Sequence, residues 1–250
     1  MEIQLLRGGA DTDINNSDGS VKTALEEGVT YKNVDKLMIA VPGKEFSILA
    51  TEVTQELYES VMGKNPSGFK GEKNLPVETV SWYDAVYFCN KLSKICGLTP
   101  VYDVDGETDV EKWNYVPNKG NKITKTVTQD ENANGYRLPT VEEWQYAAKG
   151  SQEFTYSGSG ELDEVGWYVV NSGNKTHSVA QKDPNGYVLY DMSGNVEEWC
   201  WGSDSNGKRY YCGGSWYNDA YYCAVGNRCD YNAYSTYDYL GFRIVRSTGK

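Results

Sequence analysis

Few residues in this sequence have the type and spacing that catalysis requires. His177 is the only histidine, which excludes zinc or iron sites with three imidazole ligands and any reaction that needs two imidazoles. A single histidine beside an expected strand is interpreted as structural or solvated. The six cysteines form no Cys-x-x-Cys pair and are irregularly spaced in a chain of 250 residues. This pattern favours neither a zinc site nor a disulfide framework.

Two groups of carboxylates suggest calcium or acid–base chemistry, but their spacing argues against both. Acidic residues recur from Asp103 to Glu111, yet Gly106 is fourth in this run, whereas an EF-hand loop has Gly sixth and Glu twelfth. Glu142 and Glu143 are adjacent at the expected start of a helix. There they point about 100° apart and suit the helix dipole, so a structural role is expected. No metal or cofactor is predicted.

The net charge excludes some classes of partner. The chain has 24 Lys and Arg against 35 Asp and Glu, a net charge of −11. Such a surface repels phosphate backbones and anionic lipid, so a nucleic-acid partner is not expected. No run of 18 apolar residues occurs, so membrane insertion is not expected. The chain is expected to act as a monomer.

Three helices with clear boundaries should position the remaining residues. Ser81 with Asp84, and Thr140 with Glu143, have the N-cap and N3 spacing of capping boxes. Each helix is expected to end at a glycine, which takes the left-handed backbone conformation readily. Counted from N-cap to glycine, the expected helices span residues 54–63, 81–97 and 140–150.

Short strands and loops account for the rest of the chain. Residues 37–54 predict two strands around a turn at Pro42 and Gly43, because β-branched and aromatic residues lie on both sides. Residues 158–208 are rich in turn residues, and short apolar strands are expected around Asn185-Gly186. Several short strands combined with a few helices in one chain predict the α+β class.

The first 33 residues differ from the rest. LLRGGADTDINNSDGSVKTAL resembles the middle of an ankyrin repeat, and a single repeat cannot bury its own apolar face. Residues 1–33 are therefore interpreted as a loosely docked extension. A variable leader with chance similarity is the alternative.

The segment 217–239 has an unusual composition. It contains seven tyrosines, three asparagines and three aspartates, and it lacks Lys, Glu, Leu, Ile, Phe and Pro. A tyrosine-rich β core is one interpretation, but consecutive Tyr221 and Tyr222 break the alternation of a half-buried strand. A binding surface is favoured, because antibody loops use Tyr for large rigid contacts and Asn, Ser and Asp for adaptable hydrogen bonds. Tyr210 and Tyr211 are expected in the core.

Six ordered motifs resemble those of one family. They are EVTQELY, NLPVETVSWYDAVYFCNKLS, GYRLPTVEEWQYAAKG, PNGYVLYDMSGNVEEW, GGSW and GFRIVR. Their order and spacing are similar to the formylglycine-generating enzyme family, also called the sulfatase-modifying-factor domain, over roughly residues 34–247. The resemblance implies a single compact, loop-rich domain with a C-type lectin-like fold, assigned to residues 34–250. It also implies a ligand face built from loops near the C-terminus.

The resemblance also locates the catalytic positions of the family. Its active oxidases carry two cysteines, three and eight residues after the Ser of GGS, whose thiolates bind copper and react with a substrate cysteine. The matching residues here are Asn218 and Cys223. An amide cannot become a thiolate or act as the soft ligand that Cu(I) prefers. No enzyme is therefore predicted; a formylglycine-generating copper oxidase that pairs Cys223 with Cys212 or Cys229 is the alternative.

One branch of the family, the variable proteins of diversity-generating retroelements, lacks the catalyst and resembles this chain between GGSW and GFR. In that branch, adenine-directed mutagenesis rewrites Asn codons, and the products include Tyr, Asp, Ser, Cys, Gly, Ala and Thr. The resemblance implies a variable region over residues 213–246, with Ala220, Cys223, Val225, Asn227 and Arg228 as fixed scaffold. The positions predicted to vary and to contact ligand are Tyr217, Asn218, Asp219, Tyr221, Tyr222, Gly226, Cys229, Asp230, Tyr231, Asn232, Tyr234, Ser235, Tyr237, Asp238 and Tyr239.

The sequence thus predicts a receptor or adhesin-like binding protein with a diversified surface rich in Tyr, Asn and Asp. Its expected partner is a protein or another cell-surface ligand of unknown identity. The family resemblance, rather than any signal in the sequence, implies a location at the cell surface or outside the cell.

Overall fold

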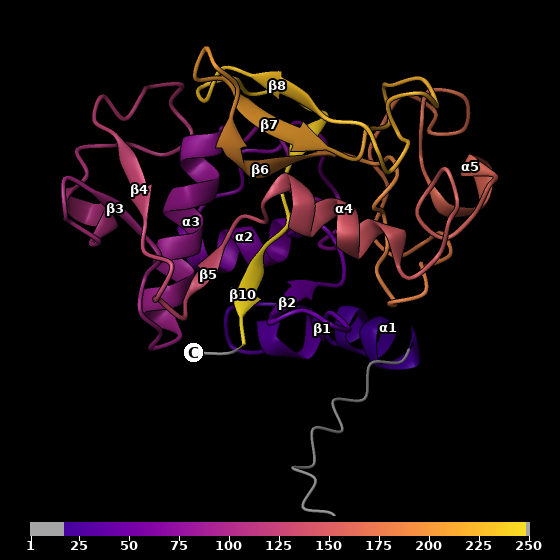
Figure 1. The fold of residues 1–250 in the computed structure, drawn as a ribbon, viewed down its shortest axis with the longest axis horizontal. Coiled ribbons are helices and arrows are strands. Elements are labelled where there is room, and N and C mark those ends of the chain that lie inside the picture. The colour runs from indigo at the N-terminus through magenta and orange to yellow at the C-terminus, as the bar shows by residue number, and fades with distance from the viewer. Residues whose placement is uncertain (1–17, 249–250) are drawn as a thin grey trace, which may run out of the picture.

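Two four-stranded sheets provide most of the β-structure in residues 18–248, the part of the chain that the computed structural model describes (Figure 1). The lower sheet in Figure 1 has the order β1–β2–β10–β5, formed by Met38–Ala40, Phe46–Leu49, Val245–Ser247 and Tyr136–Arg137. The upper sheet has the order β8–β7–β6–β9, formed by Cys229–Tyr231, Arg209–Cys212, Glu197–Ser203 and Leu240–Gly241. A separate ribbon pairs β3 (Tyr102–Val104) with β4 (Val127–Gln129).

Strand pairing joins the two ends of the described chain. β10 lies antiparallel between β2 and β5, so a C-terminal strand completes the sheet that the N-terminal hairpin begins. In the upper sheet, β6, β7 and β8 are antiparallel, and β9 runs parallel to β6. The α+β class and the loop-rich single domain are confirmed.

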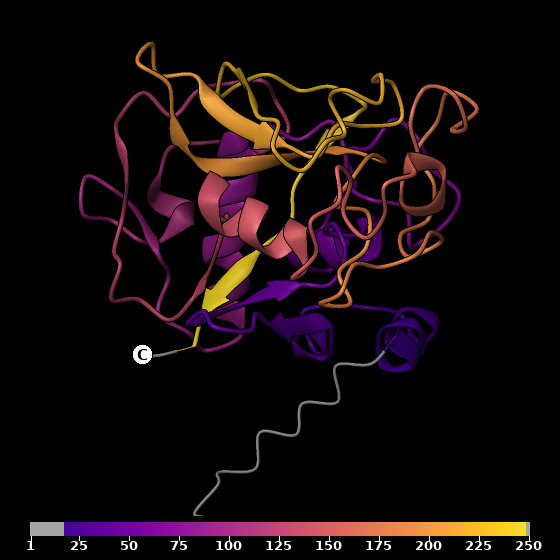
Figure 2. The same cartoon turned by 45° about the vertical axis from the view of Figure 1, so that its right-hand side comes forward.

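The three expected helices form with the predicted N-caps, and the helix expected over residues 81–97 has Cys96 as its C-cap, one residue before Gly97. α2 spans Gln55–Met62, α3 spans Trp82–Ile95 and α4 spans Val141–Lys149. Both capping boxes are present, and Gly63 and Gly150 end α2 and α4 in the left-handed conformation. α4 lies under the upper sheet and contacts β6 and β7, while α3 packs against α2 and β5 (Figures 1 and 2). Shorter elements are α5 (Leu162–Val165) and the 3-10 turns Val34–Leu37 and Val110–Lys112.

The expected N-terminal extension is described only from Asp18. Helix α1 (Asp18–Glu27) buries Val21, Ala24 and Leu25 in the main core. Asn74 Nδ2 donates a hydrogen bond to the carbonyl of Leu25, 3.1 Å away. Residues 1–17, which carry most of the ankyrin-like motif, lie outside the described residues. The domain boundary at residue 34 stays a prediction.

The chain around Asn185 differs from the expected apolar strands. Asn185 Oδ1 accepts hydrogen bonds from the backbone of Tyr187 and Leu189, and its Nδ2 donates to the carbonyl of Ala147 at the end of α4. Val188 takes a positive φ of 62°. Because a side chain satisfies these backbone groups, the segment forms a turn and needs no neighbouring strand.

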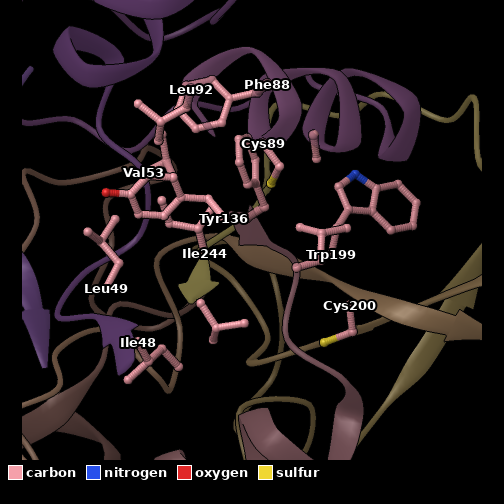
Figure 3. Close-up of a cluster of buried hydrophobic side chains, with 14 of the residues drawn as sticks. Ile48, Leu49, Val53, Phe88, Cys89, Leu92, Tyr136, Trp199, Cys200 and Ile244 are labelled. Carbon is pink, nitrogen blue, oxygen red and sulfur yellow. The ribbon is translucent and has the colours of Figure 1, made fainter. Parts of the chain in front are cut away.

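The hydrophobic core lies between the two sheets and is closed by α3 (Figure 3). Phe88 is fully buried and packs edge-on against Phe242, with ring centroids 5.3 Å apart. Cys89 lies on the same side of α3, and burial raises the pKa of its thiol well above the usual range. Core side chains labelled in Figure 3 come from both sheets and α3, and include Ile48, Leu49, Phe88, Cys89, Leu92, Tyr136, Trp199 and Ile244.

A buried ion pair connects these layers. Arg243 Nε lies 2.6 Å from Glu198 Oε2, Arg243 Nη2 lies 2.7 Å from Glu198 Oε1, and both side chains are fully buried. The guanidinium also donates to the carbonyls of Leu49 and Tyr190, at 3.1 and 2.9 Å. Trp144 Nε1 donates to Glu198 from α4, at 2.7 Å. One charged pair therefore holds β6, the chain after β9, β2 and α4 together.

Removing the cation should destabilise the protein strongly. Arg243→Met leaves the Glu198 carboxylate buried without a partner, and we expect the free energy of unfolding to fall by about 3–5 kcal/mol. The control is Arg246→Met, because Arg246 is partly exposed and lies 3.8 Å from Asp35; its loss should cost about 1 kcal/mol or less. Denaturation by guanidinium chloride, followed by tryptophan fluorescence, measures both. Equal decreases in the free energy of unfolding for the two variants would contradict the role of Arg243 in the buried ion pair.

Candidate binding surface

Gly213–Trp216 form the first half of a rigid frame around segment 217–239. Gly214 has a φ of 68°, and a Cβ there would lie 2.7 Å from Cys223 Sγ, so a larger residue would displace that side chain. Trp216 is buried, and its indole N–H donates to the carbonyl of Asp238, 3.1 Å away. The tryptophan therefore connects the beginning of the segment directly to its end.

Leu240–Arg243 form the second half of the frame. Leu240 is the register partner of Glu197 in the parallel pairing of β9 with β6. A Cβ on Gly241 would lie 2.3 Å from the carbonyl oxygen of Val77, which excludes any other residue at the observed spacing. Arg243 then makes the buried ion pair. The motifs on both sides of the segment are thus fixed by packing and hydrogen bonds.

Between the two halves of the frame, tyrosines from different parts of the chain lie side by side. Successive ring centroids are 5.6, 5.0, 5.0 and 4.5 Å apart, and three of the four contacts are stacked, with ring planes within 13° of parallel. Aromatic contacts at such distances add to the free energy of burial and restrict the rings. These side chains, called the tyrosine row, are in spatial order Tyr217, Tyr239, Tyr237, Tyr231 and Tyr211.

Two tryptophans support the ends of the tyrosine row. Trp216 contacts Tyr217 edge-on at 5.6 Å, and Trp199 contacts Tyr211 edge-on at 6.3 Å. Tyr211 is buried, with 9% of its surface exposed, as the sequence predicts. Tyr210, also expected in the core, is only half-buried, because alternation along β7 turns it to the face opposite Tyr211. On that face the Arg228 guanidinium lies over its ring, 4.7 Å from the centroid.

Burial separates the positions predicted to vary from part of the predicted scaffold. None of the positions predicted to vary is buried, and the most exposed of the tyrosines among them are Tyr217 at 59% and Tyr221 at 71%. The buried residues of segment 217–239 are Cys223, Val225 and Ala233, and none of these is predicted to vary. Arg228, predicted as scaffold, is exposed. The exposed tyrosines do not fit a tyrosine-rich core.

The remaining predicted tyrosines lie beside the tyrosine row and outside it. Tyr221 and Tyr222 contact each other edge-on at 5.4 Å. Tyr234 packs under the ammonium of Lys122, which lies 4.0 Å from the ring centroid. Lys122 belongs to the loop before β4, so a distant segment also borders this surface.

The thiols of this region are buried or half-buried, and none is activated. Cys223 is fully buried beside Leu162 and Val165, and burial raises the pKa of its thiol to about 12. Burial also raises the pKa of half-buried Cys229. A reactive cysteine needs a lowered pKa and access to solvent, and Cys223 has neither.

Asn218 is the residue that the family resemblance matches to the other catalytic cysteine. Its Oδ1 accepts a hydrogen bond from Ser215 Oγ, 2.7 Å away, and its backbone carbonyl accepts one from the amide of Val169. In residues 18–248, no group of three or more His, Cys, Asp or Glu has the geometry to hold a metal ion. The Asn218 side chain therefore acts as a hydrogen-bonding group.

His177 and Glu143 have structural partners. The His177 ring stacks on Trp167 with centroids 3.8 Å apart, its Nε2 lies 2.7 Å from the carbonyl of Ser172, and burial lowers its pKa. Glu143 completes the α4 capping box and pairs with Arg137 at 2.6 Å. Both side chains are held by contacts within the fold, as the sequence predicts.

Across residues 18–248, no helix is both long and apolar enough to span a bilayer.

The sequence does not single out Glu197, which the structure places beside the tyrosine row. Only 2% of its surface is exposed, and its Oε2 accepts no hydrogen bond from any described residue. Burial raises the pKa of Glu197 to about 8, and a hydrogen bond with the Asn218 side chain offsets part of that rise. The sequence feature that could have pointed to Glu197 is the adjacent pair Glu197-Glu198 in a strand. Alternation places these two carboxylates on opposite faces, so Arg243, which pairs with Glu198, leaves Glu197 without a cation.

Fold and site together define a loop-rich α+β domain whose glycine-rich and arginine-containing motifs frame a surface segment. The chain belongs to the sulfatase-modifying factor enzyme 1-like domain family, and the match spans residues 18–248. The predicted family is confirmed. The match begins with α1, ahead of the expected boundary at residue 34.

Relatives within this family differ in activity. Treponema denticola variable protein 1 is 40% identical, with a TM-score of 0.75, and the similarity covers 81% of this chain and 84% of that protein. The chaperone protein LppX of Paenibacillus barcinonensis is 43% identical over 81% of this chain and 80% of its own length. The inactive C-alpha-formylglycine-generating enzyme 2 of Mus musculus is 30% identical over 46% of this chain and 44% of its own. The predicted resemblance to a retroelement variable protein is confirmed.

The buried Glu197 should make stability depend on pH. Its pKa is about 8 in the folded protein and near 4.5 in the unfolded chain, so its contribution is fully present below pH 4.5 and is lost as pH rises to about 8. Glu197→Gln removes this dependence. We expect the variant to gain on the order of 4 kcal/mol over the wild type at pH 8.5 and almost nothing at pH 4.5.

Denaturation curves of both proteins between pH 4.5 and 9 measure this difference. Asp191, whose pKa burial raises to about 6, titrates in both proteins and cancels in the comparison. A constant difference across this range would show that Glu197 ionises normally.

Proposed function

We propose that the protein is a non-enzymatic binding protein whose ligand site is the diversified surface of segment 217–239. The observation that carries this proposal is burial: every position predicted to vary is at least partly exposed, whereas Cys223, Val225 and Ala233 between them are buried. A surface whose contacts can change without changing the core fits a scaffold for variable recognition. The likeness to Treponema denticola variable protein 1 supports the same proposal.

The thiols near this surface do not support an oxidase reaction. With a pKa of about 12, Cys223 is almost entirely a neutral thiol at pH 7, and the nucleophile and metal ligand is the thiolate. Its family partner is replaced by Asn218. Cys212 is buried, and the pKa of Cys229 is raised, so neither offers a replacement thiolate.

The tyrosine row can supply most of the free energy that recognition needs. Its rings are held in place by their neighbours, so little rotational freedom remains to be lost on binding. Three tyrosine hot spots at about 2 kcal/mol each give about 6 kcal/mol, against roughly 8 kcal/mol for micromolar affinity. Hydrogen bonds from Asn, Asp and Ser of the segment supply the remainder. We expect low micromolar affinity for a protein or another cell-surface ligand.

A location at the cell surface or outside the cell accords with this function, because a diversified receptor meets its partners there. The chain is proposed to act as a monomer, with neither nucleic acid nor lipid as its partner. Its acidity fits this assignment, since a net charge of −11 repels both kinds of anionic surface.

The diversification itself predicts a feature of the gene. The bases that encode residues 213–246 should have a near-copy elsewhere in the same genome, and the two should differ mainly where the copy has adenine. Sequencing the surrounding DNA tests this. A genome without such a copy would leave a binding surface that does not diversify by this route.

Truncating exposed tyrosines should abolish binding and leave the fold intact. The triple variant Tyr217→Ala, Tyr221→Ala, Tyr237→Ala removes rings that are 59%, 71% and 38% exposed. We expect peptides selected on the immobilised wild-type protein from a display library to bind this variant at least 100-fold more weakly by calorimetry. The melting temperature should fall by less than about 4 °C.

Ile95→Ala is the matched control, because Ile95 is an exposed apolar residue, at 43%, at the far end of α3 from the surface. Its peptide affinities should equal those of the wild type. Unchanged affinities in the triple variant would refute the assigned surface, and a large fall in melting temperature would favour a structural role for the tyrosines.

A further inference from the structure

A narrow hollow beside the tyrosine row has a carboxylate in its wall. Its lining includes Glu197 and Tyr211 of the sheet, Tyr222 and Arg228 of the variable segment, and Cys229 at the start of β8. Its cavity volume is about 10 Å³, enough for about one water-sized group. A compact ammonium head matches a space of this size better than a planar guanidinium or a quaternary ammonium.

One oxygen of the Glu197 carboxylate lacks a donor, although the Asn218 side chain hydrogen-bonds to the carboxylate. Glu197 Oε2 is buried and accepts no hydrogen bond from residues 18–248. Its neighbour on the opposite face of β6, Glu198, is fully paired with Arg243. A buried carboxylate oxygen without a donor costs free energy until one arrives. The fold therefore keeps one strong acceptor unpaired at the ligand surface.

The groups around the hollow also favour a cation. Tyr211 and Tyr231 stack at 4.5 Å beside it, and Tyr222 lines it; the faces of such rings attract positive charge. Exposed Asp219 lies on the same loop as Tyr222. The net charge of −11 adds a long-range attraction.

Arg228 is the cation at the rim, and its position explains why it does not neutralise Glu197. Its guanidinium lies over the Tyr210 ring, 4.7 Å from the centroid. Tyr210 and Tyr211 are consecutive in β7, so their side chains point to opposite faces of the sheet. The guanidinium is therefore drawn toward the face away from Glu197.

We propose that this hollow binds a primary ammonium group of the ligand, with Glu197 accepting its hydrogen bonds. The assignment rests on the proposed function and adds a chemical class to it: the partner presents a lysine side chain or another primary amine. The small volume selects ammonium over guanidinium, so the surface distinguishes lysine from arginine. Because Glu197 lies outside the predicted variable positions, its contribution to this preference persists while the tyrosines change.

A simple amine tests the assignment directly. The full-length protein is titrated with n-butylammonium chloride at constant ionic strength and followed by NMR. At pH 8.5, Glu197, with a pKa of about 8, is mostly ionised and the amine is still charged. We expect saturable shifts around the hollow with a millimolar Kd. Guanidinium and tetramethylammonium should bind at least tenfold more weakly, and equal binding of all three cations would overturn the proposal.

Two variants should change the affinity in opposite directions. Glu197→Gln keeps the shape of the side chain but removes its charge, so n-butylammonium should bind at least tenfold more weakly. Arg228→Gln removes a repelling charge at the rim and should strengthen binding about threefold. Unchanged affinity in Glu197→Gln, or weaker binding in Arg228→Gln, would contradict the proposal. The opposite signs exclude general loss of folding as the cause.

Three further probes distinguish between the possible sources of the amine. They are a lysine amide, glucosamine and phosphoethanolamine. We expect the lysine amide to bind most tightly, because its long alkyl chain alone can reach the hollow past the tyrosines. Tighter binding of glucosamine or phosphoethanolamine would overturn the lysine assignment. If the selected peptides bind the tyrosine surface and their affinity is the same for Glu197→Gln as for the wild type, only the ammonium assignment fails. If n-butylammonium binds as predicted but the selected peptides bind the triple tyrosine variant as tightly as the wild type, only the proposed function fails.

Discussion

The ion pair between Arg243 and Glu198 is the interaction on which the rest of the structure depends. Both groups are fully buried, so neither tolerates loss of the other. The pair holds β6 in place against β2 and α4 through the carbonyl of Leu49 and the indole of Trp144. Once Glu198 points into the core, the alternation of β6 directs Glu197 to the opposite face. The same constraint thus sets the interior and one wall of the binding surface.

The frame around segment 217–239 separates stability from recognition. The Trp216 indole joins the two ends of the segment by a hydrogen bond to Asp238, and Gly241 attaches the second end to the domain by a close contact with the Val77 carbonyl. Most side chains between them point to solvent or to one another, so replacing them removes little core packing. The fold can therefore accommodate the changes in surface side chains that the proposed function requires. Cys223 remains as a packing group, and Asn218 as a hydrogen-bonding one.

In the proposed function, the buried carboxylate of Glu197 gives the surface a preference for cations that its amino-acid composition does not reveal. Tyrosine, asparagine and aspartate bind many kinds of ligand, but a buried acidic group beside them favours one charge. Burial raises the pKa of Tyr211, Tyr231 and Tyr239, and the charge of Glu197 raises each further. The tyrosines consequently stay neutral and serve as hydrogen-bonding and aromatic contacts. The fold pays for this arrangement with the cost of a poorly solvated carboxylate.

The sequence by itself determined the local elements and the family. Ser81 with Asp84 fixes the start of α3, because a cap depends on residues three apart and on nothing distant. The sequence also separated the framing motifs from the tyrosine-rich segment between them. Only the tertiary structure decided what is brought together across the chain: the stacking of Tyr217 on Tyr239, the side-chain hydrogen bonds of Asn185 that replace an expected strand, and the unpaired state of Glu197. These features depend on which distant groups meet, and local spacing carries no information about that.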